Sequence, residues 1–254
     1  MLVNVFSGPA VNAARGLALQ LSSAVQGFVT NFMTAVNPQI TKSYASGERD
    51  YMISLVLKSA RISFYLLLLL VLPIFVNCEY LLGLWLGDVP EGTERFARLF
   101  LILSMSECLS NPLMTSALAT GKIRNYQILV GGLIMLNLPV SYLFLKAGAP
   151  PEVTVAVAIV ISQICLVARL ILLKKMMDFP VGRFFHEVYF NVLTVTFLAV
   201  LFLPLLPKTQ DSFWLFALNV ILCVVMTALW ILFAGCSRSE IKQLMSYVLK
   251  RFRR

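Results

Sequence analysis

Charged residues are scarce in this sequence. Only 13% of its 254 residues are Asp, Glu, Lys or Arg, whereas 59% are hydrophobic. Soluble domains hold about a quarter charged and about half apolar residues. The apolar residues here lie in long blocks, which indicates a lipid surrounding. The composition therefore excludes an ordinary soluble domain and predicts an all-α membrane protein, since helices satisfy their backbone polar groups internally.

Residues that bind metals or form disulfides are also few. His186 is the only histidine, which excludes a His-rich metal cluster, and the five cysteines have no paired spacing. Most of the cysteines lie inside apolar blocks, where Cys behaves as a small hydrophobic residue. We therefore expect no disulfide, no metal site and no cofactor.

Acidic residues are outnumbered, so the chain carries a formal net charge of +9. Nucleic-acid binding predicts a basic face interleaved with aromatic residues. The Lys and Arg residues instead fall at the ends of apolar blocks, where they orient membrane spans. We expect membrane lipids, and no nucleic acid, as partners.

Six apolar segments are each long enough to cross a hydrocarbon layer of about 30 Å. The segments are 62–86, 96–118, 124–146, 152–174, 188–207 and 212–235. The connections between them are short and rich in Gly, Pro and polar residues, as in "GDVPEGTE" and "PKTQDS". No gap could hold a soluble catalytic domain, so we expect the protein not to be an enzyme.

Loop charges predict the orientation of these spans. One set of loops, together with the chain end, holds most of the basic residues: Lys42, Arg49, Lys58, Arg61, Lys122, Arg124, Arg169, Lys174, Lys175, Arg183, Arg238, Lys242, Lys250, Arg251, Arg253 and Arg254. The alternate loops hold only Arg95, Arg98, Lys146 and Lys208. The positive-inside rule places the first set in the cytoplasm. The end of the chain repeats Ile241, Leu244, Met245, Val248, Leu249 and Phe252 on one helical face, which predicts an amphipathic helix on the anionic cytoplasmic leaflet.

Residues 11–40 are predicted to be a seventh span with a polar stripe. Polar residues recur at helical spacing along one face: Asn12, Arg15, Ser22, Gln26, Thr30, Thr34 and Asn37. Polar groups facing lipid would lack hydrogen-bond partners, so the stripe must face other helices or water. Two interpretations follow. The stripe either holds helices together, or it lines an aqueous cavity.

A second polar group interrupts the span at 96–118. Glu107 lies near the middle of this span, and ionisable groups at that depth are costly and mark functional sites. Asn111 follows it, and Pro112 is expected to bend the helix. Asn137 and Pro139 predict another break within 124–146. Broken helices with polar interruptions are typical of a substrate path through a transporter.

The front of the chain resembles a known family. The stretch "FSGPAVNAARGLALQLSSAVQGFVTNFMTAVNPQITKSYASGERDYM" is similar to a block in bacterial polysaccharide-transporter flippases, and "LLGLWLGDVPEGT" resembles the end of a later span in that family. The resemblance covers essentially the whole chain. It implies the fold of the multidrug and toxin extrusion transporters, in which two six-helix bundles surround a central cavity and two C-terminal helices are often added.

The resemblance also implies a domain organisation. Residues 1–178 would form the second bundle, and residues 179–254 the two extra helices with the basic tail. "MLVNVF" is similar to the end of the family's seventh helix, so we expect a C-terminal fragment or a truncated reading frame that lacks the first bundle. Because the cavity needs both bundles, we expect no export by residues 1–254 alone.

The implied function is export of undecaprenyl-pyrophosphate-linked O-antigen or capsule repeat units across the bacterial inner membrane. A guanidinium pairs bidentately with phosphate, so its charge makes Arg15 the candidate to bind the pyrophosphate. The remaining stripe residues, with Glu107 and Asn111, are candidates to line the cavity. The alternatives are a cation-coupled drug exporter of the same fold, in which Glu107 binds the coupling ion, and a non-transporting membrane scaffold.

Overall fold

The computed structural model describes residues 2–205 and 213–236, and every regular element in that part is a helix. The longer helices are α1 (Leu2–Ala45), α2 (Arg49–Val76), α3 (Cys78–Leu86), α4 (Thr93–Cys108), α5 (Asn111–Ala119), α6 (Ile123–Met135), α7 (Asn137–Lys146), α8 (Val153–Met177), α10 (Phe190–Leu201) and α11 (Phe213–Trp230). Short elements are α9 (Val181–Phe184), the π-helical turns η1 (Phe185–Tyr189) and η3 (Ile231–Gly235), and the 3-10 turn η2 (Leu203–Leu205). The predicted all-α class is therefore confirmed. The predicted amphipathic tail and Lys208 lie outside the described residues.

Five segments are long and apolar enough to cross a membrane: Arg49–Val76, Ile123–Lys146, Val153–Met177, Val181–Leu201 and Phe213–Gly235. These segments identify the chain as a membrane protein. Helix α1 has the length of these segments but not their hydropathy, and α4 and α5 are each shorter, so the count of about seven spans stays a prediction.

The first apolar span lies earlier than its predicted place at 62–86. Helix α2 begins at Arg49 and ends at Val76, and the last part of the predicted segment forms the separate helix α3. The prediction was wrong at both ends because hydropathy marks the apolar part of a helix, not its hydrogen-bonded length. Asn77 between the two helices donates its side-chain amide to the carbonyl of Pro73 at 2.9 Å.

Two helix breaks were predicted from proline, and both are confirmed. Helix α4 ends at Cys108, four residues before Pro112, and α6 ends at Met135, four residues before Pro139. Proline lacks an N–H, and its ring clashes with the carbonyl four residues earlier, which explains both end points. Helix α1 also bends, at Gly8, where φ is +82° just before Pro9.

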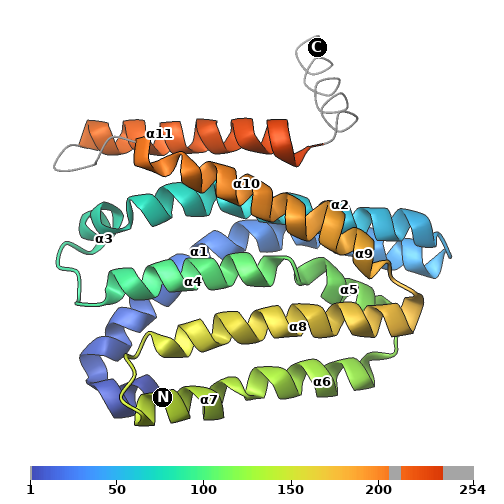
Figure 1. Ribbon diagram of the computed structural model, residues 1–254, viewed down its shortest axis with the longest axis horizontal. Coiled ribbons are helices and arrows are strands. Elements are labelled where there is room, and N and C mark those ends of the chain that lie inside the picture. The colour runs from blue at the N-terminus through green and yellow to red at the C-terminus, as the bar shows by residue number, and fades with distance from the viewer. Residues whose placement is uncertain (1, 206–212, 237–254) are drawn as a thin grey trace.

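The helices lie in layers (Figure 1). Helix α1 packs against α2, α4 and α5, and α8 lies between the α4–α5 pair and the α6–α7 pair. Helices α10 and α11 pack on the opposite side, against α2. Thus α4, α5 and α8 form the middle of the bundle, where a site can contact several elements. The predicted domain boundary after residue 178 coincides with the end of α8, and the division itself stays a prediction.

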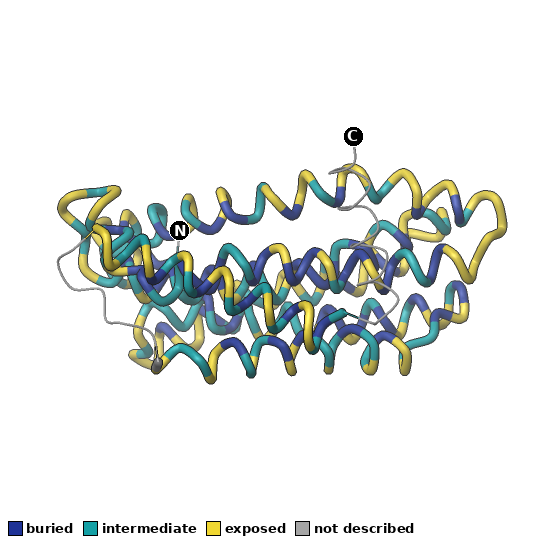
Figure 2. The backbone as a smooth tube through the Cα atoms, turned by 90° about the horizontal axis from the view of Figure 1, so that it is seen from above, coloured by how far each residue is buried: buried dark blue, intermediate teal, exposed yellow. Residues whose placement is uncertain are grey.

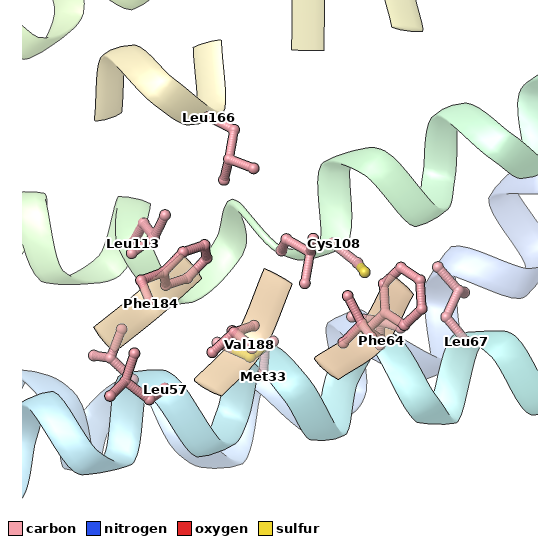
Figure 3. Close-up of a cluster of buried hydrophobic side chains, with 14 of the residues drawn as sticks. Met33, Leu57, Phe64, Leu67, Cys108, Leu113, Leu166, Phe184 and Val188 are labelled. Carbon is pink, nitrogen blue, oxygen red and sulfur yellow. The ribbon is translucent and has the colours of Figure 1, made fainter. Parts of the chain in front are cut away.

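The main apolar core joins most of these helices. Figure 3 shows Met33 of α1, Phe64 of α2, Leu113 of α5, Leu166 of α8 and Val188 of η1 gathered in one buried cluster. Buried and exposed positions alternate along the helices (Figure 2). Large apolar side chains remain exposed on α10 and α11, among them Phe197, Leu201 and Trp214, which suits contact with lipid.

Polar contacts attach the C-terminal helix pair to α2. The amide of Asn77 donates to Asn219 of α11 at 3.1 Å, and both side chains are buried. The hydroxyl of Tyr65 donates to Asn191 of α10 and also lies 3.3 Å from the carbonyl of Gly235. Buried polar pairs of this kind fix one helix against another where the surroundings are apolar.

Candidate functional site: a cavity between α1 and α4 to α8

A cavity of about 380 Å³ lies between six helices. Most of its lining is apolar, and its uncharged polar side chains are Ser110, Asn111, Asn137, Thr154 and Ser162. Its charged side chains are Arg15, Glu107 and Arg169. The volume falls in the range of small-molecule sites, about 300–1,000 Å³, and a mainly apolar wall with a few polar groups is typical of them. Two guanidinium groups against one carboxylate give the lining an excess of positive charge, which favours an anion.

Arg15 reaches this cavity from α1. Its guanidinium carbon lies 5.6 Å from the centre of the Phe100 ring, a cation–π contact. Its Nε is buried, and no hydrogen-bond partner for it exists among the described residues. Glu107 is the one carboxylate of the cavity lining, and in the described part of the chain no ion pair joins Arg15 to it. Arg15 therefore presents an incompletely satisfied cation to the cavity.

Glu107 is held by the polar stripe of α1. The side-chain amide of Gln26 donates to its Oε2 at 3.4 Å and to the Ser104 hydroxyl at 2.9 Å. Glu107 is exposed, and it also lines a smaller cavity of about 140 Å³ together with Gln26 and Thr30. The carboxylate is thus positioned by α1 but remains accessible from two sides of α4.

The other stripe residues divide between packing and exposed positions. Ser22 is buried, with its hydroxyl 2.6 Å from that of Ser104, and Asn37 accepts a hydrogen bond from Thr115 at 2.8 Å. Thr30 and Thr34 are exposed and donate to carbonyls of their own helix, at 3.1 and 2.8 Å. Asn12 is half-buried. Each sequence interpretation therefore describes part of the stripe: Ser22 and Asn37 hold helices together, whereas Arg15, Gln26 and Thr30 line cavities.

Arg169 is a site residue that sequence reasoning missed. It was counted among the loop charges, but it lies within α8 and lines the first cavity. Its Nε donates to the Tyr126 hydroxyl and its Nη1 to the Ser110 hydroxyl, both at 2.9 Å. The signal was its position in "CLVARLILLKK", where apolar residues separate it from the two lysines in the last turn of the helix.

A second cavity continues from the first. It has a volume of about 480 Å³ and shares Arg15, Ile134, Asn137 and Thr154 with it. Leu2, Val3 and Leu138 are among its other lining residues. Arg15 lines both cavities, which suits a ligand that carries an anionic group between two larger parts.

Comparisons of the chain with protein-family models, with curated proteins and with solved structures found no match.

Proposed function

We propose that the chain belongs to a transporter that moves undecaprenyl-pyrophosphate-linked oligosaccharide repeat units across the bacterial inner membrane, for O-antigen or capsule. The observation that carries this proposal is Arg15, a cation with an unpartnered buried Nε at the junction of two cavities. A guanidinium fork matches phosphate oxygens bidentately. In this account the diphosphate binds Arg15, and the polar side chains of the first cavity hydrogen-bond the sugars.

A cation-coupled drug exporter is the second candidate, and Glu107 is the observation in its favour. A carboxylate in a membrane cavity can bind a coupling ion. Such an exporter would need an aromatic-lined pocket for its drugs. The lining of the first cavity contains one aromatic residue, Phe100, and the guanidinium of Arg15 already covers its ring. The lining therefore favours an anionic, sugar-bearing substrate over a drug.

The proposed orientation places the loop at Lys122 and the C-terminus in the cytoplasm, because the basic residues gather in that set of loops. Ala147 and Lys122 are both exposed near opposite ends of the α6–α7 pair. A cysteine replacing Ala147 is expected to react with an impermeant thiol reagent added to intact cells, whereas one replacing Lys122 is expected to react only after lysis. The reverse pattern would overturn the orientation.

Photo-crosslinking tests the proposed substrate. Leu103 lines the first cavity, whereas its neighbour Ile102 is exposed and is not part of the lining. A photoreactive amino acid at position 103 is expected to capture a lipid-linked oligosaccharide in cells that make one, and the same group at position 102 is expected to capture phospholipid. Mass spectrometry of the adducts distinguishes the two. Phospholipid alone at both positions would count against the proposal.

A further inference from the structure

The first cavity has two cationic side chains in its lining. Arg15 stacks on Phe100, and Arg169 donates to Ser110. These two contact residues are ten positions apart along α4 and the break that follows it, which corresponds to roughly 15 Å at a rise of 1.5 Å per residue. The two guanidinium groups are therefore held by contact residues at different depths of the cavity.

Arg169 is held in a fixed orientation. Two of its five N–H donors are used by the hydroxyls of Tyr126 and Ser110, both buried side chains from different elements. In the described part of the chain no ion pair joins Arg169 to a carboxylate. Glu107, the one carboxylate of the cavity lining, attracts Arg169 without forming an ion pair with it. The remaining donors therefore belong to a preorganised cation that lines the cavity.

Glu107 lies on α4 between the residues that the two cations contact. It comes seven residues after Phe100 and three before Ser110, and all three line the first cavity. Its negative charge repels an anion that passes between the two guanidinium groups. The electrostatic profile along the cavity therefore has two favourable positions for an anion and an unfavourable one between them.

We propose that Arg169 forms a second diphosphate site, occupied in sequence with Arg15 as the substrate crosses. This inference rests on the proposed function, in which Arg15 forms the other site. With the proposed orientation, α8 runs from the outside to the cytoplasm, so Arg169 is the site nearer the cytoplasm. The substrate binds Arg169 first, passes Glu107 and then binds Arg15.

Protection of single cysteines by inorganic pyrophosphate tests both sites separately. A cysteine replacing Thr154 reports on the Arg15 end of the cavity, and one replacing Asn111 reports on the Arg169 end. The purified full chain without a reporter gives the blank, since four of its five native cysteines are buried. At a pyrophosphate concentration about ten times Kd, labelling of each reporter is expected to slow about tenfold. Sodium chloride at equal ionic strength controls for screening.

Each arginine is then replaced by glutamine in a separate variant. Arg169→Gln is expected to remove protection at position 111 and keep it at position 154, and Arg15→Gln is expected to do the reverse. Protection at position 111 that is absent, or that survives Arg169→Gln, would overturn the second site while leaving the first intact. Protection at position 154 that does not depend on Arg15 would instead contradict the proposed function.

A purely structural role for Arg169 predicts a different pattern. Tyr126→Phe and Ser110→Ala each remove one hydrogen bond but keep the positive charge. If Arg169 only joins helices, these variants and Arg169→Gln will lower thermal stability alike without a specific effect on protection. If it binds the anion, Arg169→Lys will restore part of the protection at position 111, and Arg169→Gln will not.

Discussion

Ser22→Leu is expected to remove most of the folded protein, whereas Ser23→Leu on the same helix is expected to leave it near the wild-type level. Ser22 is 3% exposed and lies against Ser104, so a larger side chain would force α1 and α4 apart. Overpacking and the lost hydrogen bond together cost about 2–4 kcal/mol, a large part of the stability of a domain.

Ser23 is the matched control for this change. Its side chain is exposed and donates only to the carbonyl of Leu19 in its own helix, at 2.8 Å. Thermal unfolding of detergent-purified protein, with membrane abundance measured by blot, compares the two variants. Equal stability of both would mean that the α1–α4 contact is not as tight as its 2.6 Å hydroxyl pair indicates.

Arg15→Ala is expected to abolish most polysaccharide export while membrane abundance stays unchanged, and Arg15→Lys is expected to keep part of it. Loss of charge-assisted hydrogen bonds to a diphosphate, about 1.5–3 kcal/mol, corresponds to roughly a ten- to hundredfold loss. Lysine keeps the charge but not the bidentate fork. Complementation of a surface-polysaccharide defect measures export, with the first bundle that the family resemblance implies expressed alongside.

Arg95→Ala provides the control for Arg15→Ala. Its side chain is 77% exposed and lies 3.7 Å from Glu152, a surface pair outside the cavity. Such pairs contribute little, so export is expected to be unchanged. A fall in abundance after Arg15→Ala would point instead to a structural role in packing on Phe100. Wild-type export by Arg15→Ala at normal abundance would remove Arg15 from the account.

Features that depend on local chemistry were predictable from the sequence. The breaks before Pro112 and Pro139 follow from the geometry of proline, and the apolar segments follow from their composition. The extent of α2 was not predictable in this way. Its hydrogen bonds continue through Lys58 and Arg61, which hydropathy had assigned to a loop.

Features that depend on which helix faces meet could not be predicted. The periodicity of α1 placed Ser22 and Arg15 on one stripe, yet only Ser22 meets α4 in a close polar contact. Gln26 as the partner of Glu107, and Ser110 and Tyr126 as partners of Arg169, join segments far apart in the sequence. A sequence pattern gives the face of each helix but not its neighbour, so Arg169 was counted with the loop charges.

Transfer of a lipid-linked oligosaccharide between leaflets is the most direct measurement of the central claim. Proteoliposomes would hold the chain together with the first bundle that the resemblance implies, and an external lectin would detect sugars that reach the outer leaflet. The account predicts transfer above the protein-free level that is largely lost with Arg15→Ala. Transfer that is equal with and without the protein, or that is unaffected by Arg15→Ala, would contradict it.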